Sequence, residues 1–573
     1  MPDREREPGG ARRSGRSRRE PREGAFLFGL ARREKIKRPG KKPLVQIRFY
    51  WKRVFAVLGV LAFLGWLAGG AALYFYFKEH RDYDEVSFPR MLVLPFRMEE
   101  HRREMGEFYI RRGMEEIKEG EFRTGFHHLR TGLARAPANA AARIMLARIF
   151  YEGYRDNRLA VEALLKGLPH AGRDPEILGK EYLYLLFALL DAEEADERRI
   201  ELADELAPRV SDPGLRSFLA RQAAAAEIET GRFTAAAARL GQDGIRNSPE
   251  GIRLLADLLH RSGEPRRALA VLEDGVERFP ADPRISSFFV RLLIERGRWE
   301  DLLGHVEFRR ILNPGIPAPW LARLQALQNL GRADEVPAAV EEIFERFPEE
   351  TVRRELLRFA VESNRSDVAE MVLARAAEPE TADSILAALA FLKDDRPAKT
   401  LALLDALPEE VRDEARLKGL RSAAHAMLDQ DEAALTNLQL FLDEEHATSR
   451  IYVSVAEIFA ERGFESQARR VLAEAVRRHP TDRAALLALL RLDPVPGGSR
   501  DRLRHASALA FGRIPPVEDL RGIRDEIVSD RYILNPDRDE VVARIDWVLD
   551  QARERSPVVP VSAGALIGGA TTD

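Results

Sequence analysis

The chain has 573 residues, a formal net charge of −3 and no cysteine. This length is too great for one compact domain, and the missing cysteine excludes disulfides, thiolate metal sites, cysteine nucleophiles and an N-terminal lipidated cysteine. The near-neutral total hides an asymmetry. Residues 1–53 hold 18 Lys and Arg against 6 Asp and Glu, a net of +12, so the remainder carries the balance of −15.

Residues 1–53 are predicted to form a basic, largely disordered tail. The first 24 have almost no large apolar side chain, so they cannot bury enough surface to offset the entropy of ordering. A short apolar patch, 25–30, lies among the basic residues. Three roles stay open for the tail: a topology signal, which we favour, contact with anionic lipid, and nucleic-acid binding, which we do not expect.

Residues 54–77 contain no charged side chain. A helix of this length reaches ~36 Å, enough to cross a hydrocarbon core of ~30 Å, and aromatic residues stand at both ends. We predict a single uncleaved transmembrane helix rather than a signal peptide, because 53 residues precede it. The basic tail places the N-terminus in the cytoplasm, the chain in the inner (cytoplasmic) membrane, and everything after the helix on the extracytoplasmic, periplasmic side.

Gly65 and Gly69 lie four residues apart within this helix. Small residues at that spacing let two membrane helices approach closely, so the pair predicts a transmembrane dimer contact and hence a homodimer.

After a predicted linker, 78–105, a pattern of about 34 residues repeats through 106–496. Its turn markers are Gly120, Gly153, Gly231, Gly263, Gly297, Gly331, Asn364, Asp395, Asp429 and Gly463, with a weaker turn near 193–196. Prolines follow many of the second helices, for example Pro137, Pro280 and Pro480.

This pattern resembles the tetratricopeptide repeat, a helix–turn–helix unit with a bulky residue, a turn glycine, a small residue and a final proline at fixed places. The clearest units carry Tyr109, Gly113, Gly120, Phe122, Gly125, Leu129, Gly132 and Pro137, and Tyr452, Ala456, Phe459, Gly463, Ala468, Leu472, Ala475 and Pro480. The resemblance implies an all-α fold, a right-handed α-solenoid of about eleven helical hairpins preceded by one transmembrane helix. Residues 497–556 are expected to form a helical C-terminal cap, and 557–573 a disordered tail.

No catalytic constellation is found. The sequence has no H-E-x-x-H, no glycine-rich phosphate loop and no G-x-S-x-G. The adjacent pair His127 and His128 is poorly placed to share a metal on a helix, and the cluster 443–446 is expected to be a solvated turn. We therefore predict no enzyme, no cofactor and no metal. The alternative from another class is a regulatory arm of an enzyme whose activity lies in 497–556.

The resemblance also implies that the first helix of each hairpin lines a concave surface where partners bind. The residues expected to face this groove are Arg253, Asp257, Arg284, Arg291, Gln325, Gln328, Arg354 and Arg358. Because this section is basic within an acidic ectodomain, we expect an extended acidic segment or a C-terminal carboxylate as ligand. The alternative is that these side chains form a solvated face. The family's two-carboxylate clamp is not reproduced, since Ala225 and Leu254 stand where amides are needed.

Together these features predict a bacterial membrane-anchored scaffold or adaptor that binds other proteins on the extracytoplasmic side. The layout suggests envelope assembly, secretion or polysaccharide export. A chaperone-like holder of exported chains is the main alternative, and an array facing the cytoplasm is a third. The partner and the pathway are not encoded in any motif that we can identify.

Overall fold

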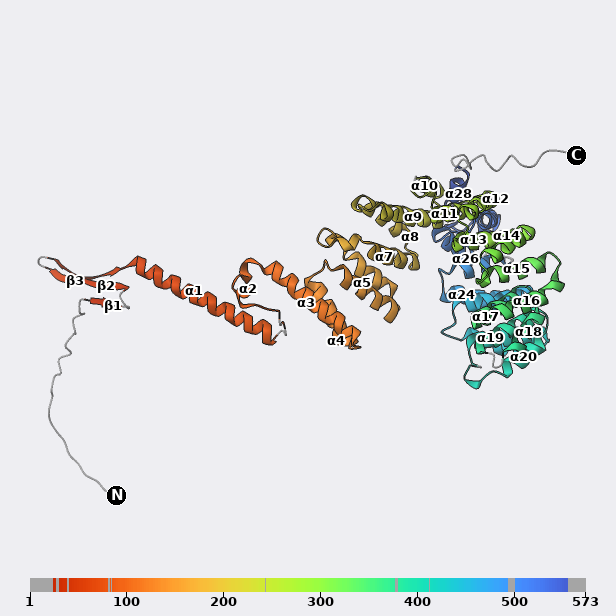
Figure 1. Ribbon diagram of the computed structural model, residues 1–573, viewed down its shortest axis with the longest axis horizontal. Coiled ribbons are helices and arrows are strands. Elements are labelled where there is room, and N and C mark those ends of the chain that lie inside the picture. Colours follow the sequence, from red (N-terminus) through yellow and green to blue (C-terminus); the bar gives the residue numbers. More distant parts are fainter. Residues whose placement is uncertain are drawn as a thin grey trace, which may run out of the picture. The chain divides into compact units, whose positions relative to one another are not determined.

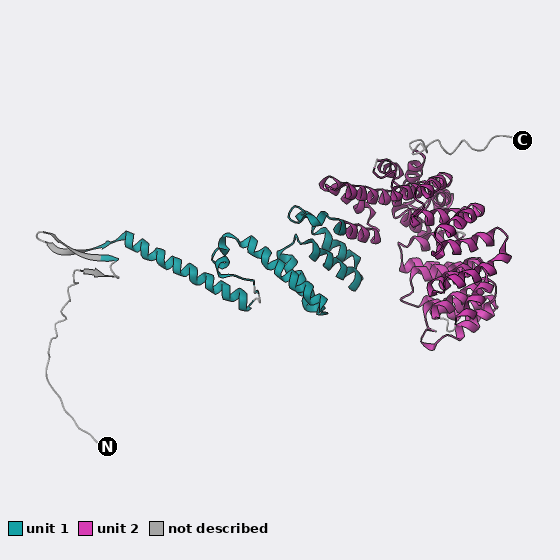
Figure 2. Cartoon of the chain, viewed as in Figure 1, with its two compact units in different colours: residues 1–182 teal, residues 183–573 magenta. Residues whose placement is uncertain are grey.

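The structure is a computed structural model that describes residues 24–26, 30–38, 41–80, 83, 85–242, 244–376, 380–411, 413–492 and 500–554. The chain divides into two compact units, residues 1–182 and residues 183–573 (Figure 2). The predicted disordered segment 557–573 lies outside the described residues, as do residues 1–23 of the tail.

A three-stranded antiparallel sheet precedes the first helix, in the order β1-β2-β3. Its strands are β1 (Gly24–Phe26), β2 (Ala31–Arg38) and β3 (Lys41–Phe49). We predicted a largely disordered tail here, and for these strands that prediction is wrong. The signal that we missed is the alternation of Val45, Ile47 and Phe49 with Gln46 and Arg48, which is the period of a strand.

The helix α1 (Trp51–Phe75) continues into a π-helical turn, Tyr76–His80, so the predicted span 54–77 is helical throughout. This helix is long and apolar enough to cross a membrane, and most of its side chains are exposed. Gly70 is the one residue of α1 that is buried.

The segment 78–105 is more ordered than the linker that we predicted. It contains α2 (Phe88–Leu92), a short 3₁₀ turn (Leu94–Phe96) and the start of α3 (Met98–Lys118). Met91 and Tyr83 are buried in a small core that Tyr74 and Phe77 of the first helix partly cover. This core fixes the first hairpin to the end of α1.

The rest of the chain is a series of helical hairpins (Figure 1). In the first unit they are α3 with α4 (Phe122–Arg135), and α5 (Ala140–Arg148) with α6 (Asn157–Leu165). The next are α7 (Lys180–Ala192) with α8 (Asp196–Leu206), α9 (Pro213–Glu229) with α10 (Phe233–Leu240), α11 (Pro249–Arg261) with α12 (Pro265–Arg278), and α13 (Pro283–Glu295) with α14 (Trp299–Leu312). Then follow α15 (Pro317–Asn329) with α16 (Val336–Arg346), α17 (Glu350–Glu362) with α18 (Ser366–Arg375), α19 (Thr381–Lys393) with α20 (Pro397–Asp405), α21 (Ala415–Met427) with α22 (Asp431–Leu442), and α23 (Ser449–Glu461) with α24 (Glu465–Arg478).

Each hairpin turn has one residue with positive φ, and these residues confirm the repeat count. Eleven described residues adopt this conformation: Gly120, Arg155, Glu194, Gly231, Gly263, Gly297, Gly331, Asn364, Asp395, Asp429 and Gly463. The predicted markers are therefore correct except Gly153, which lies in a π-helical turn (Ile149–Gly153) while Arg155 takes the left-handed position. Asn and Asp tolerate this region better than other non-glycine residues, which explains the turns at Asn364, Asp395 and Asp429, while Arg155 and Glu194 adopt it without that preference.

The array ends in α25 (Arg483–Arg491), followed by α26 (Arg500–Phe511), α27 (Val517–Val528) and α28 (Arg538–Glu554). These last three helices correspond to the predicted helical cap. They do more than cover the last repeat, because α26 contacts α25 while α28 contacts α10 near the other end of the same unit. The core of residues 183–573 thus includes side chains from both ends of the array, such as Phe233 and Ile545.

Helices α3 and α4 cross so closely that only glycine fits at their contact points. A Cβ atom on Gly113 would lie 2.7 Å from both the carbonyl oxygen of Gly125 and the amide nitrogen of Leu129. One on Gly132 would lie 2.7 Å from the carbonyl oxygen of Gly106. These are backbone atoms that cannot move aside, so the glycines set the distance between the two helices.

Gly113→Ala is therefore expected to lower the free energy of unfolding of residues 98–182 by ~1–3 kcal/mol, the usual cost of overpacking. The matched control is Gly153→Ala in the same unit, where an added Cβ meets no atom within 4 Å. That change should be neutral or stabilising by roughly 0.5–1 kcal/mol. Urea unfolding of the full chain in detergent, followed by circular dichroism and limited proteolysis, checks both values. Equal effects of the two substitutions would contradict the tight crossing.

Candidate interaction groove

Within residues 183–573 the first helices of neighbouring hairpins contact one another at several points. Helix α9 contacts α11, α17 contacts α19, and α21 contacts α23, whereas successive second helices make no contacts of similar extent within the described residues. Helices on the inner side of a curved stack lie closer together than those on the outer side. The first helices thus contact one another more than the second helices do, and the groove along them stays a prediction.

The eight predicted groove residues all lie on four of these first helices, α11, α13, α15 and α17. Three of the arginines have acidic partners within the chain. Arg284 forms ion pairs with Glu250 and Asp282, and Arg358 pairs with Glu355. Arg354 lies 2.5 Å from a carboxylate oxygen of Glu380 and also pairs with Glu350 and Asp383. Their charges are therefore partly neutralised before any ligand arrives.

The two glutamines connect neighbouring hairpins. The amide nitrogen of Gln325 donates to Glu362 at 2.7 Å, and the amide oxygen of Gln328 accepts from Arg365 at 2.8 Å. Both partners come from the α17–α18 hairpin, one repeat further along the chain. These two side chains thus contribute to the stacking of the repeats.

Arg253 and Arg291 keep the most available charge among the predicted set. Within the described part of the chain neither has an ion pair, and the guanidinium of Arg291 lies 4.5 Å from the ring centre of Phe288. Asp257 is engaged, because its carboxylate lies 3.3 Å from Arg261. Among the predicted set, the available positive charge therefore lies on α11 and α13.

Arg416 on α21 is a further basic residue close to Arg358 that the sequence analysis missed. Burial, and after it the charges of Arg450 and Arg358, lowers the pKa of Arg416, while Glu414 opposes this only in part. The guanidinium groups of Arg358 on α17 and Arg450 on α23 therefore lie close enough to repel that of Arg416. No sequence signal could have grouped them, since they stand up to 92 residues apart.

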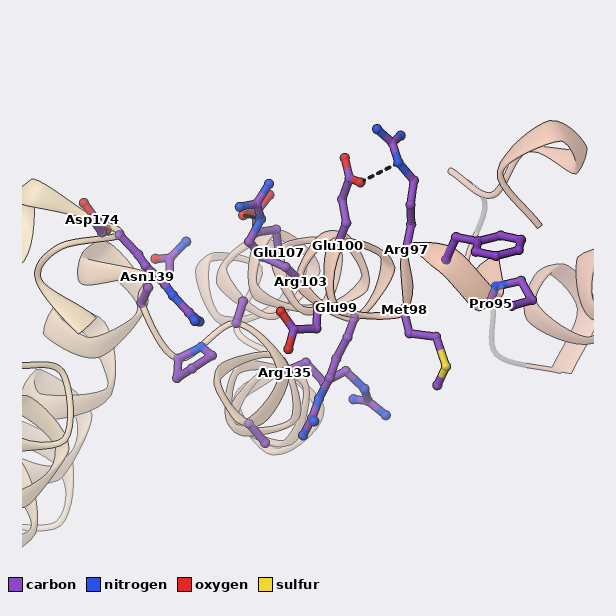
Figure 3. Close-up of a pocket in the computed structure, with 17 residues that line it drawn as sticks. Pro95, Arg97, Met98, Glu99, Glu100, Arg103, Glu107, Arg135, Asn139 and Asp174 are labelled. Atoms are coloured by element: carbon purple, nitrogen blue, oxygen red, sulfur yellow. Dashed lines mark ion pairs between the residues drawn. The ribbon is translucent and has the colours of Figure 1, made fainter. Parts of the chain in front are cut away.

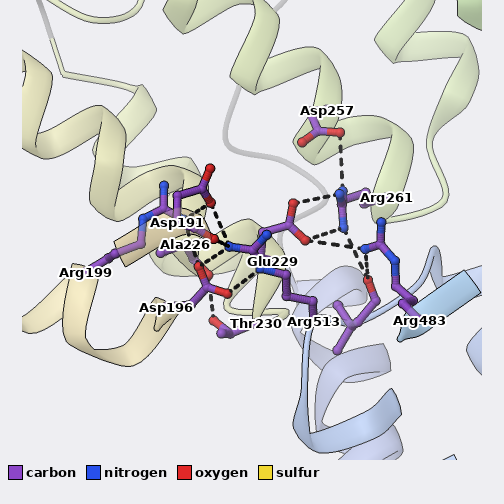
Figure 4. A network of polar contacts seen from close by, with 11 residues as sticks. Asp191, Asp196, Arg199, Ala226, Glu229, Thr230, Asp257, Arg261, Arg483 and Arg513 are labelled. Atoms are coloured by element: carbon purple, nitrogen blue, oxygen red, sulfur yellow. Dashed lines mark hydrogen bonds and ion pairs between the residues drawn. The ribbon is translucent and has the colours of Figure 1, made fainter. Parts of the chain in front are cut away.

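The groove belongs to an array that is closed by its own C-terminal segment. Arg513, just after α26, reaches Asp191 at 2.7 Å and Asp196 at 2.8 Å (Figure 4). Arg199 bonds the same two carboxylates at 2.8 Å, and both Asp196 and Arg199 are buried. Burial lowers the pKa of Arg513, but the hydrogen bonds and charges of Asp196 and Asp191 outweigh it, so that the pKa rises above its ordinary value.

A second set of contacts lies beside the first. Arg261 binds both carboxylate oxygens of Glu229, at 2.8 and 2.9 Å, and also donates to the carbonyl of Ile514 at 3.2 Å (Figure 4). The amide of Ile514 donates to the carbonyl of Glu229 at 2.8 Å, and its side chain is fully buried. Arg544 donates to the carbonyl of Thr230 at 2.9 Å. The C-terminal helices are thus bound to the turn between α9 and α10 by main-chain as well as side-chain groups.

Another contact connects turns two repeats apart. Lys393 lies 2.9 Å from Glu461, and Arg462 donates to the carbonyls of Leu392 and Lys393 at 3.1 and 2.5 Å. The α19–α20 and α23–α24 hairpins are therefore tied at their turns. Such ties limit how far the groove can open.

Arg513→Ala should lower the free energy of unfolding of residues 183–554 by ~1.5–3 kcal/mol, the usual contribution of hydrogen bonds to a charged group, because the buried Asp196 loses one of its two cationic partners and keeps Arg199. The matched control is Arg504→Ala on α26, whose side chain is 74% exposed and pairs only with Asp501. That change should cost ~0–1 kcal/mol. Denaturant unfolding by circular dichroism gives the energies, and hydrogen exchange shows whether α9 and α10 lose protection in the first variant. A loss equal to that of the control would mean that the closing contact is not stabilising.

The first unit has a cleft of 1210 Å³ between the start of α3 and the α4–α5 connection. Its lining alternates in charge: Arg97, Glu100, Arg103 and Glu107 pair along α3, and Arg135 faces them from α4 (Figure 3). This mixture of open, self-paired charges resembles a solvated surface more than a small-molecule site.

The two motifs considered for chemistry are accounted for by local contacts. His128 lies 2.6 Å from Glu116 and stacks on Tyr109, and Glu444 pairs with Lys418. Among the residues that the structure describes, no group of three or more His, Asp or Glu is placed to hold a metal ion.

The comparisons with known proteins point to one repeat family. Residues 249–292, which cover α11, α12 and most of α13, match the family model of the tetratricopeptide repeat. No curated protein matches the chain.

Solved structures share the repeated hairpins at low similarity. A tetratricopeptide repeat protein from Parabacteroides merdae is 13% identical, with a TM-score of 0.27 over 42% of this chain and 97% of its own. Naa15/Naa10 bound to HypK-THB is 14% identical, with a TM-score of 0.24 over 78% and 80%. The Cut9–Hcn1 assembly of the APC/C is 12% identical, with a TM-score of 0.21 over 68% and 96%. At such scores we take nothing about partners or function from them.

Proposed function

We propose that this chain, which is a tetratricopeptide-repeat protein, is a membrane-anchored scaffold that binds other proteins through its repeat array. The observation that carries the proposal is the combination of an exposed apolar helix, α1, with eleven stacked hairpins directly after it. Stacked hairpins present a long surface and few loops on which to build a catalytic site, so we propose no catalytic activity.

The orientation that we propose has the N-terminus in the cytoplasm and the array outside it. The support is electrostatic: residues 1–53 carry +12, and positively charged segments beside a membrane helix are retained on the cytoplasmic side. In a bacterial cell the array then works in the periplasm, as a support for envelope assembly, secretion or polysaccharide export. Gly65 and Gly69 have open space around them, which suits the proposed homodimer contact.

The ligand that we propose for the groove is an extended acidic segment. Arg253 and Arg291 offer charge on α11 and α13, and Arg358 and Arg450 repel Arg416 on later first helices. An incoming carboxylate would relieve that repulsion and accept paired hydrogen bonds from a guanidinium group. Arg284 and Arg354 already have ion pairs within the chain. At those two positions the ion pairs favour the alternative, a solvated face that binds no ligand.

One observation favours the second candidate function, a holder of unfolded exported chains. The end of α14 and the residues after it expose Phe308, Ile311, Leu312 and Ile316, with Ile311 82% exposed. Exposed apolar side chains in a group are typical of a surface that binds apolar segments. They lie on a second helix, outside the proposed groove.

The orientation can be tested by cysteine labelling, since the chain has no cysteine of its own. Leu534→Cys, at a side chain that is 95% exposed, should react with an impermeant maleimide once the outer membrane alone is opened. Ser17→Cys, in the basic tail, should react only after the inner membrane is lysed. The reverse pattern would mean that the array faces the cytoplasm, and reaction of both before lysis would contradict the membrane span.

Arg291→Glu and Arg358→Glu test the groove. The measurement is crosslinking in cells, followed by purification of the array with whatever partner protein is attached to it. Each substitution should lower the amount of attached partner by roughly tenfold, because a charge pair at an interface contributes ~1.5 kcal/mol or more. The matched controls are Arg266→Glu and Arg470→Glu, at exposed arginines on the second helices α12 and α24. Capture should be unchanged in the controls, and circular dichroism should show that all four variants are folded. Equal capture by all four would refute the acidic-ligand proposal.

A further inference from the structure

We propose that residues 86–98 form a second membrane contact, lying in the lipid interface beside α1 and holding the first hairpin at the bilayer surface. The inference rests on the proposed membrane insertion of α1. Its ligand is the phospholipid of the leaflet in which α1 ends, with acyl chains for the apolar side chains and phosphates for the arginines.

The depth of this segment follows from one contact. Leu92 of α2 covers Gly70 of α1 so closely that a Cβ on the glycine would lie 2.6 Å from its Cδ2 atom. A hydrocarbon core of ~30 Å needs about 20 helical residues. If that core begins at Val54, it ends near Leu73, beyond Gly70. The contact therefore lies within the apolar layer, and α2 must enter it.

The composition of the segment suits this position. Residues 86–98, VSFPRMLVLPFRM, contain two arginines and no acidic residue. Phe88, Val93, Phe96 and Met98 are exposed, with Phe96 at 82% and Met98 at 65%. In water these side chains would form an unprotected apolar patch, whereas aromatic and aliphatic residues flanked by arginine are typical of membrane-interface segments.

The segment is held rigidly enough to stay at this depth. Tyr83 donates its amide to the carbonyl of Phe77 at 3.1 Å, and Phe77 packs edge-on against His101 of α3 with ring centres 4.8 Å apart. Arg90 of α2 lies 3.2 Å from Glu104. The end of α1, the α2 segment and α3 are thus connected to one another by several independent contacts.

The two arginines each have one ion pair within the chain, Arg90 with Glu104 and Arg97 with Glu100, and still expose most of their side chains to a headgroup. The side chains of Arg90 and Arg97 are 58% and 66% exposed. Arg97 stands beside Pro95 and Met98 at the start of α3, where the ribbon leaves the 3₁₀ turn (Figure 3). Long basic side chains can keep their stems in apolar surroundings while the guanidinium reaches phosphate. The segment therefore has apolar side chains for the acyl chains and guanidinium groups for the phosphates.

The test uses the full-length chain in vesicles of phosphatidylcholine and phosphatidylglycerol in equal amounts. Single cysteines are introduced by Phe96→Cys in the segment, Leu64→Cys in α1 and Phe122→Cys in α4, then labelled with an environment-sensitive fluorophore. Phe122 is the matched control, an aromatic side chain that is 63% exposed but lies on the first hairpin. Quenching is measured with nitroxide-bearing lipids and with aqueous iodide.

We expect lipid nitroxides to quench the labels at positions 64 and 96, and iodide to quench the label at position 122. If position 64 is quenched by lipid while position 96 behaves like position 122, α1 spans the membrane but the inference is wrong. If iodide quenches the label at position 64 and the lipid nitroxides do not, the membrane proposal itself fails and the inference fails with it.

A second pair of variants tests the contact that sets the depth. Gly70→Leu should displace α2 and remove lipid quenching at position 96, while the label at position 64 stays quenched. Gly59→Leu, in open space on the same helix, should change neither label. Unchanged lipid quenching at position 96 in the Gly70→Leu protein would overturn the depth argument.

Discussion

An α-helical hairpin of this kind cannot cover its own apolar face, and the arrangement of the chain depends on what covers that face at each point. Inside the array the next hairpin does so, and glycine at contacts such as Gly113 on Gly125 sets how closely the helices approach. At the end of the array the last hairpin has no successor. Helices α26 to α28 cover it and then return to the turn after α9, where Arg513 and Ile514 meet groups from α7 to α9. Residues 183–554 are consequently closed upon themselves rather than open at one end.

This closure bears on how the groove can work. A solenoid with free ends can stretch or coil to fit a partner, whereas one tied at Glu229 and again between Lys393 and Glu461 is held near one curvature. A ligand then gains from a preformed surface, because less ordering is needed on binding. The same rigidity explains why many groove arginines have internal partners. Where repeats are fixed against each other, a carboxylate from the next hairpin, such as Glu380 beside Arg354, comes within reach and neutralises the charge.

The repeat count and most turn residues could be predicted from the sequence because they depend on local conformation. The hairpin turn requires a positive φ at Gly263 and at Asn364, and glycine and asparagine are residue types that adopt it readily. The return of the C-terminal helices could not be predicted, because Arg513 and Asp191 are 322 residues apart and no periodic pattern relates them. For the predicted groove, the spacing put Arg291 and Arg358 on first helices, but charge counting could not show that Arg358 pairs with Glu355 or lies near Arg416.

The region around α1 shows the same limit at short range. Prolines and the absence of a repeat made 78–105 resemble a linker, yet Leu92 meets Gly70 and Met91 is buried against the end of α1. Glycine in an apolar helix has two physical uses, close approach to a second copy or close approach to the helix's own chain, and sequence spacing does not separate them. Here Gly70 serves the second use, while Gly65 and Gly69 keep open surroundings on which a partner helix can pack. A helix that is packed against the segment directly after it transmits its orientation to the first hairpin, so that α3 and α4 follow α1 through a packed core instead of a flexible tether.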